Sequence, residues 1–245
     1  MKKKIKIALV TIITALYLSG CIVAGFSGSN TVAGIGDMES YVFSVGVYSG
    51  IRVEGAVNVN YYSAPSNTVT LSVQPNLMEY FKIEVEGNDL VIRTTRGINP
   101  GSGKFPVLTI STPVLNRIDV SGACSFTTHD SITADSLTII LGGAGSGKVD
   151  MDVNALSVVI SGAGKIDLSG NAENADFNFS GAGDLNALSL QTREASVIFT
   201  GAGSVKVHCT DYLRINANGA GSIQYRGSPQ IDLNKSGVVS ITKVD

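Results

Sequence analysis

Hydrophobic and polar residues alternate along most of this 245-residue chain, most regularly in its C-terminal half. In one stretch Leu156, Val158 and Ile160 are apolar, and Ser157 between the first two is polar. Equivalent apolar triplets follow at Ala175, Phe177, Phe179; Ala195, Val197, Phe199; and Leu213, Ile215, Ala217. A period of two predicts β-strands with one buried face. Apart from the N-terminal leader, the only helical feature we expect is a turn at residues 75–81.

A short Gly-Ala-Gly phrase recurs between these strands. It reads ISGAG at Ile160–Gly164 and FSGAG at Phe179–Gly183. The first glycines of its copies stand at positions 122, 143, 162, 181, 201, 219 and 237. Self-similarity at a period near 20 residues is typical of a solenoid, in which each repeat is one coil stacked on the last.

These patterns predict the fold class: an all-β, single-stranded parallel β-helix, with the right-handed form favoured over the left-handed one. Each coil is expected to contain a strand, a Gly-Ala-Gly corner, a second strand and a return loop such as SGNAEN at residues 169–174. We expect the corner glycines to adopt positive φ, and the alanine to be the only residue small enough to fit between stacked corners. The spacing between the first two of these glycines, at positions 122 and 143, is the longest, and we interpret Ser146-Gly147 as a two-residue insertion.

A β-rich portion precedes the coils. Period-two patterns at residues 50–62, 68–73, 82–86, 90–94 and 105–111 predict strands, and Gly87-Asn88 predicts a hairpin turn. We therefore assign residues 41–245 to one β-helix domain.

The N-terminus reads as a lipoprotein signal peptide over residues 1–20. Lysines at positions 2, 3, 4 and 6 precede an apolar run of about a dozen residues, which is short for a membrane span and suits a secretory leader. The following Leu18-Ser19-Gly20-Cys21 resembles a lipobox, so Cys21 is the expected lipidation site and the membrane the expected partner. Because Ile22 is not an aspartate, the outer membrane is favoured. A plain signal peptide with a chance cysteine is the alternative.

Residues 21–40 are Gly/Ser-rich around GFSGSN and are expected to form a tether. Without residues 1–20 the chain keeps 14 of its 18 basic groups against 20 acidic ones. This acidic balance, without Lys/Arg clusters, argues against nucleic acid as a partner.

Only Cys124 and Cys209 remain after Cys21. They belong to the first and fifth coils, about four strand spacings apart, so a disulfide is excluded and both thiols are expected to be free and buried. His129 and His208 are the only histidines and are expected to face solvent. We therefore expect no metal site.

GGAGSGK at Gly142–Lys148 resembles a nucleotide-binding P-loop, but Val149 stands where Ser or Thr should ligate magnesium. The next residues alternate as a strand instead of opening a helix. We interpret this stretch as one more corner, and we expect no cofactor.

Four aspartates are candidates for catalysis, since β-helix polysaccharide lyases and hydrolases use carboxylates on an exposed strand face. They are Asp150, Asp152, Asp167 and Asp184. The first two share a strand face about 6–7 Å apart, which is within the range for glycosidases but unspecific. Exposed acids usually keep a β-helix soluble, so no catalytic residue is assigned.

The lipobox, the β-rich opening, the SGAG repeats and YRGSP at Tyr225–Pro229 together resemble the bacterial family described as "putative auto-transporter adhesin, head GIN domain". The resemblance spans residues 41–243. It implies a β-helix on a secreted or lipid-anchored protein with an adhesive role, and it carries no catalytic residues to this chain.

Three functions follow from these observations. The first is a non-enzymatic, lipid-anchored envelope protein that binds a protein or glycan through a β-helix face, on either side of the outer membrane. The second is a carbohydrate-active β-helix enzyme. The third is a structural envelope protein without a specific ligand.

Overall fold

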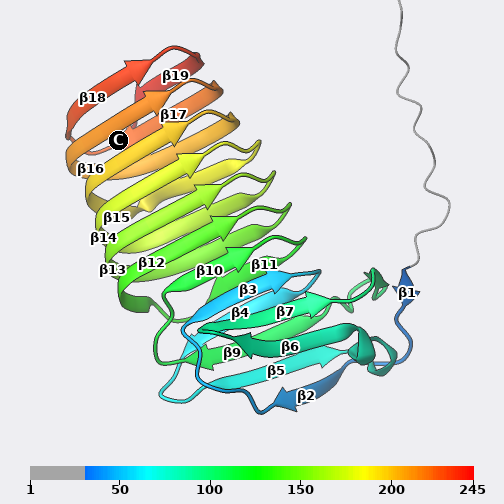
Figure 1. Ribbon diagram of the computed structural model, residues 1–245. Helices are drawn as coiled ribbons and strands as arrows, with labels where there is room; N and C mark the ends of the chain where they lie inside the picture. The colour runs from blue at the N-terminus through cyan, green and yellow to red at the C-terminus, as the bar shows by residue number, and fades with distance from the viewer. Residues whose placement is uncertain (1–30) are drawn as a thin grey trace, which may run out of the picture.

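The computed structural model describes residues 31–245 and is almost entirely β-structure, with one short 3-10 helix, η1 (Pro75–Tyr80). Figure 1 shows a stack of coils whose C-terminal strands lie at one end and whose N-terminal strands lie at the other. The predicted signal peptide and Cys21 lie outside the described residues. Within residues 31–245 no helix is long and apolar enough to cross a bilayer.

The N-terminal strands are β1 (Val32–Ala33), β2 (Glu39–Phe43), β3 (Gly50–Glu54), β4 (Asn58–Ser63), β5 (Thr68–Val73), β6 (Phe81–Glu86), β7 (Asp89–Thr94), β8 (Ile98–Asn99) and β9 (Val107–Thr112). The following strands are β10 (Arg117–Val120), β11 (Ser125–Thr128), β12 (Ile132–Leu141), β13 (Ser146–Ile160), β14 (Lys165–Phe179), β15 (Asp184–Phe199), β16 (Ala202–Ala217), β17 (Ala220–Arg226), β18 (Gln230–Lys235) and β19 (Val238–Lys243).

These strands form a parallel β-solenoid of about seven turns, which confirms the predicted fold class. We call the strand segment before each corner the first side of a coil, and the segment after it the second side. Inward residues stack directly on one another because neighbouring coils are in register: Phe177 pairs with Val197, and Phe179 with Phe199. The rings of Phe179 and Phe199 are stacked with centroids 5.2 Å apart. Columns of apolar side chains therefore run along the axis and form one core.

The return of each coil is a strand, and this corrects the prediction of a loop. β13, β14, β15 and β16 are each 15 or 16 residues long and run from one corner to the next without a break. The SGNAEN return at residues 169–174 pairs in parallel with the return of β15. The chain bends at Gly170, whose φ is +103°, and this bend lets hydrogen bonding continue around the edge.

The corner glycines are required for a different reason from the one expected. None of the seven first glycines has a positive φ. A β-carbon on Gly162 would lie far inside 3.0 Å of the Gly143 carbonyl oxygen, and one on Gly181 would meet the Gly162 carbonyl oxygen in the same way. That oxygen accepts a hydrogen bond from Ala182 N at 3.0 Å. The corners are thus stacked backbone on backbone, and their alanines point outward and are exposed.

Ser146-Gly147 is not an insertion. Ser146 pairs with Ser125, and the extra residues of the first coil lie instead between Thr128 and Ile132, where the register changes. Gly147 takes an inward position next to Phe126, and a β-carbon on it would meet the side chain of Ile166. The missing side chain leaves room for its larger neighbours.

The N-terminal portion is part of the same solenoid. β3 and β4 pair in parallel with β10 and β11 above them, and with β7 and β9 below them. Between β3 and β4 the chain reads VEGAV, an additional copy of the corner phrase: the Gly55 carbonyl oxygen lies where a β-carbon of Gly122 would be. This copy was missed because 67 residues separate it from the next one.

The N-terminal end of the solenoid is closed by a cap. After β4 the chain forms β5, η1 and β6 before it returns through β7, and the new strands pair antiparallel: β6 with β7, and β5 with both β9 and β2. Leu77 of η1 is fully buried. At the other end, β18 and β19 each pair with one strand only in the described chain, β16 and β17 respectively.

Part of the expected tether is structured. β1 pairs with β8, and the Asn76 side chain bonds both Ile35 N and the Ala33 carbonyl. Lys104 Nζ donates to the Gly36 carbonyl and lies 3.0 Å from Asp37. Residues 31–37 are therefore held against the cap.

Candidate binding groove on the return edge

The P-loop-like stretch is a corner, as the sequence indicated. Gly142 N donates to the Val120 carbonyl at 2.8 Å, and Ser146 N donates to the Cys124 carbonyl at 2.9 Å. Val149 is buried in β13. Amides that would have to bind phosphate are thus engaged with the coil below.

The two histidines lie on the outer surface of the second side. His129 is exposed and stacks on Tyr62, with centroids 4.6 Å apart, and its Nε2 lies 3.0 Å from Asn60 Oδ1. His208 points outward but is half-buried, and this burial together with nearby Arg226 lowers its pKa. Among residues 31–245 no three His, Cys, Asp or Glu side chains are grouped as metal ligands. Cys124 and Cys209 are free and buried, as predicted.

The four candidate aspartates do not converge. Asp150 accepts a hydrogen bond from Ser169 at 2.7 Å, and Asp167 accepts one from Asn186 at 2.9 Å. Asp184 lines a small hollow next to the corner edge, and Asp152 lies on the return edge. The structure brings no pair of these carboxylates to a common reaction site.

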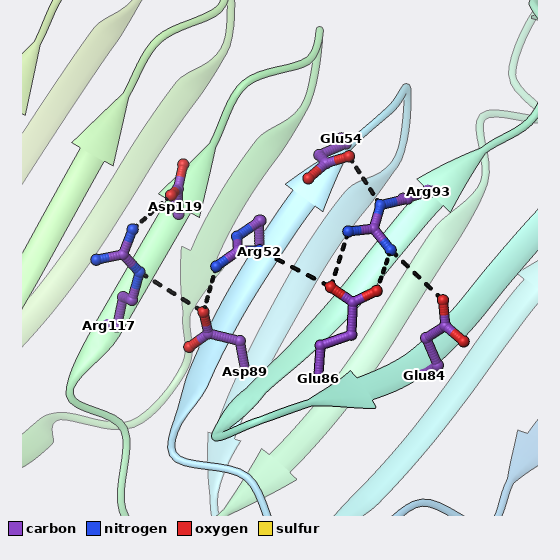
Figure 2. A network of polar contacts seen from close by, with 8 residues as sticks. All are labelled: Arg52, Glu54, Glu84, Glu86, Asp89, Arg93, Arg117 and Asp119. Carbon is purple, nitrogen blue, oxygen red and sulfur yellow. Dashed lines mark hydrogen bonds and ion pairs between the residues drawn. The ribbon is translucent and has the colours of Figure 1, made fainter.

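A network of charged residues covers the outer face of β3, β6, β7 and β10 (Figure 2). Arg93 contacts three glutamates, Arg52 lies 2.7 Å from Asp89, and Arg117 lies 2.7 Å from Asp119. The three glutamates are Glu54, Glu84 and Glu86. Each charge is matched within the network, so we interpret it as a brace that ties the cap to the first coils.

The return edge between β13 and β16 is hollowed. In Figure 1 this edge lies on the left of the stack, opposite the corners. Beneath the hollow the inward column reads Leu156, Ala175, Ala195 and Leu213, and both alanines line the hollow although their side chains are buried in the core. Phe177 and Phe179 fill the centre of the same coil as Ala175. We call the hollowed edge between β13 and β16 the return-edge groove.

The groove consists of two adjoining hollows of about 240 and 390 Å³. The first is lined by Asn174, Ala175, Asp176, Glu194, Ala195, Ser196, Tyr212 and Arg214. The second is lined by Asp152, Val153, Asn154, Asn171, Ala172, Glu173, Gln191, Arg193, Thr210 and Asp211. Their lining residues are sequence neighbours, such as Glu173 and Asn174, so the hollows lie side by side.

Hydrogen-bonding side chains follow the groove in columns parallel to the solenoid axis. One column contains Asp152, Asn171 and Gln191, and the next contains Asn174, Glu194 and Tyr212. Successive members lie one strand spacing apart, about 4.8 Å. The groove therefore offers a polar pattern that repeats along its length.

Several groove side chains have no partner among residues 31–245, in hydrogen bonds or ion pairs. They are Asp152, Asn171, Asn174, Asp176 and Gln191. Tyr212, in contrast, is held in place: its hydroxyl donates to Asp232 at 3.1 Å and its ring carries the Arg214 guanidinium at 5.7 Å. The groove thus combines a fixed aromatic ring with free amides and carboxylates.

The sequence analysis placed Ala175 and Ala195 correctly on the inward face but did not identify the groove. The residues that line it, such as Asn174 and Asp176, occupy ordinary polar positions of the alternation, so the sequence pattern carries no separate signal for a hollow here.

The family model described as "Putative auto-transporter adhesin, head GIN domain" matches residues 47–229. No curated protein matches the chain significantly. A crystal structure of a "putative adhesin" from Bacteroides fragilis covers 87% of this chain and 100% of its own, at 24% identity and a TM-score of 0.80. A "putative lipid binding protein" from Parabacteroides distasonis has 23% identity and a TM-score of 0.72, with 88% and 100% covered. A "putative adhesin" from Parabacteroides merdae has 23% identity and a TM-score of 0.63, with 88% and 99% covered.

Proposed function

This chain belongs to the family described as "Putative auto-transporter adhesin, head GIN domain", and we propose that it is a cell-envelope adhesin that binds a glycan in the return-edge groove without chemical turnover. The observation that carries this proposal is the row of unpartnered amides and carboxylates beside Tyr212. Amide and carboxylate groups bind sugar hydroxyls by hydrogen bonds, and an aromatic ring packs against the apolar face of a sugar.

A repeating ligand suits a repeating surface. Each column presents one hydrogen-bonding side chain per coil, a carboxylate, an amide or a phenol, about every 4.8 Å, which is close to the length of one sugar unit in an extended chain. A polysaccharide that lies along the axis would meet one such group per coil, on β13 to β15 in the first column and on β14 to β16 in the second. A folded protein partner has no such period, and this favours the glycan.

Rigidity supports the same conclusion. The groove residues stand on continuous strands that are hydrogen-bonded on both edges, so little conformational freedom is lost on binding. The shallow shape of the groove, and the engagement of Glu173, Glu194 and Asp211 by Arg193, agree with binding rather than turnover.

A glycan array probed with the full chain tests the proposal, followed by calorimetry with the best ligand. Asn174→Ala is expected to weaken binding about tenfold, because one buried hydrogen bond contributes about 1 kcal/mol and desolvation adds to the loss. The matched control is Asn186→Ala on the second side of β15, which should bind normally. Retained affinity in Asn174→Ala, or equal losses in both variants, would count against the groove.

We also propose that the adhesin is anchored to the outer membrane through acylated Cys21. Labelling of growing cells with a palmitate analogue should mark the wild-type chain, and Cys21→Ser should abolish the label and release the protein from the membrane fraction. A Cys21→Ser chain that stays labelled and membrane-bound would refute the anchor. This leaves the groove proposal intact, because the groove lies on the coils of β13 to β16, far along the solenoid from the cap.

A further inference from the structure

We infer that the return-edge groove selects glycans that carry free amino groups and rejects acidic glycans. The inference rests on the proposed glycan-binding function and adds the ligand class to it. It comes from the balance of charges along the groove and from how those charges are already paired.

Carboxylates outnumber cations in the groove. The two hollows are lined by five carboxylates and two guanidinium groups: Asp152, Glu173, Asp176, Glu194 and Asp211 against Arg193 and Arg214. No lysine lines either hollow. The potential along the groove is therefore negative, and it attracts positive groups within the screening distance of about 8 Å at physiological salt.

Both arginines are already engaged by carboxylates. Arg193 contacts Glu173 and Glu194, at 2.5 and 2.9 Å, and lies 3.8 Å from Asp211. Arg214 Nε lies 3.1 Å from Asp232, and its guanidinium rests on the Tyr212 ring. An acidic sugar could recruit either arginine only by displacing a carboxylate that is already there.

Two carboxylates remain unmatched. Asp152 on β13 and Asp176 on β14 have no hydrogen-bond or ion-pair partner among residues 31–245, and each lines one of the hollows. A protonated sugar amine supplies three N–H donors and a positive charge. Charge-assisted hydrogen bonds of this kind are roughly twice as strong as neutral ones.

The second side of the same coils shows the opposite arrangement. There Asp150 and Asp167 accept hydrogen bonds from Ser169 and Asn186, whereas Lys148 and Lys206 have no partner in the described chain. Asp184 on the second side also has no partner in the described chain, but it lines a hollow together with Lys165 and Lys206, whereas no lysine lines the return-edge groove. The second side provides the control surface for an experiment.

The test compares three oligosaccharides of equal length: one with free amines, its N-acetylated counterpart, and an oligouronate. The full chain should bind the amine form about tenfold or more tightly than the acetylated form, and the uronate most weakly, since one charge-assisted hydrogen bond contributes about 1.5–3 kcal/mol. Raising the salt concentration should reduce the difference in affinity between the amine form and the acetylated form.

The double variant Asp152→Asn/Asp176→Asn should lose the preference for the amine while still binding the acetylated glycan. Asp167→Asn on the second side is the control and should keep the full preference. Equal binding of amine and uronate by the wild type overturns the charge selection but leaves glycan binding standing, and so does a preference that survives in the double variant. A lysine oligomer that binds as tightly as the amino glycan overturns it too, since the groove would then read charge alone. If none of the three sugars binds, the proposed function itself fails.

Discussion

The corner edge and the return edge are built from the same coils by opposite means. At the corners, backbone packs on backbone: the Gly162 carbonyl oxygen occupies the place of any side chain on Gly181, and the alanines only cover the outside. At the return edge the strands are equally continuous, but the outward side chains vary from coil to coil and line a groove. One edge therefore specifies the stack, and the other is free to specify a ligand.

This division teaches how a solenoid can hold a binding site without losing its fold. The first glycine of each corner tolerates no added atom, so it recurs in every copy. The return needs only to keep its backbone hydrogen bonds, and its outward residues can change without disturbing the stack. The predictions below test whether stability and binding separate in this way.

The largest loss of unfolding free energy is expected for Gly181→Ala. The new β-carbon would overlap the Gly162 carbonyl oxygen, so the two corners must move apart and the Ala182 hydrogen bond must break. We expect a loss of at least about 3 kcal/mol in unfolding free energy, measured by urea unfolding followed by circular dichroism. Ala182→Ser, one residue away and exposed, should unfold at the wild-type urea concentration. Equal midpoints for the two variants would contradict the corner argument.

Ala175→Leu should separate binding from stability. It introduces the residue that stands at the equivalent position of the previous coil, Leu156; because this side chain points into the core, it should push the strand outward beneath the first hollow. Overpacking against Phe177 should cost about 1–3 kcal/mol. The chain should stay folded by circular dichroism, while glycan binding measured by calorimetry is lost. Undiminished affinity would show that the ligand does not use this hollow.

The two cysteines report on the two edges separately, because Cys124 replaces the second glycine of a corner and Cys209 lies at a return. Burial raises the pKa of the Cys124 thiol to about 12, and it also raises the pKa of the Cys209 thiol. Since the thiolate is the reactive form, alkylation of folded protein at pH 8 should be roughly 10³-fold slower at Cys124 than in unfolded protein.

The same shift has a consequence for stability. A thiol whose pKa is raised by folding stabilises the folded state fully below its unfolded pKa of about 8.5, and this contribution is lost as the pH rises toward 12. Unfolding free energy should therefore fall by about 1.4 kcal/mol per pH unit for Cys124 above pH 9, and Cys124→Ala should flatten this slope. A slope that Cys124→Ala leaves unchanged would contradict the assignment.

The smallest change in unfolding free energy is expected for Arg193→Gln. Its ion pairs with Glu173 and Asp211 are exposed, so the unfolding free energy should change by only about 0–1 kcal/mol. Arg117→Gln in the charged network of Figure 2 is the comparison, because Arg117 Nε is buried; here we expect about 1–2 kcal/mol. Arg193→Gln should also tighten the binding of an amine-bearing glycan, as it removes a competing cation. A loss larger than that of Arg117→Gln would reverse the contrast.

Much of the fold could be predicted from the sequence, because period-two alternation and the glycine phrase depend on local geometry. The turn at η1, the hairpin after Glu86 and most strands were expected, whereas β1, β2 and β8 and the strand conformation of the returns were not. The reason for the glycines was wrong, since a carbonyl oxygen of the neighbouring coil is a contact that φ preferences do not reveal. The corner at Gly55 was missed because the cap separates it from the other copies.

The groove, unlike the fold, could not be predicted from the hydrophobic pattern alone. Ala175 and Ala195 fit the same apolar alternation as Leu156, because the alternation does not depend on the size of the side chain. The charge matching of Arg193 and the isolation of Asp176 depend on which side chains the stacking places together. Such pairings follow from the register of coils, and the register was uncertain where the first coil carries its extra residues.

The two ends of the stack give it a direction. The cap closes one end, while at the other Ile231 and Leu233 are 40% and 49% exposed on a strand that has a single neighbour in the described chain. In a nearest-neighbour assembly, a unit held on one side melts before units held on both. Fraying should start at β18 and β19 and travel inward one coil at a time. The groove, whose last strand is β16, would lose its ligand only after β18 and β19 have detached and unfolding has reached β16.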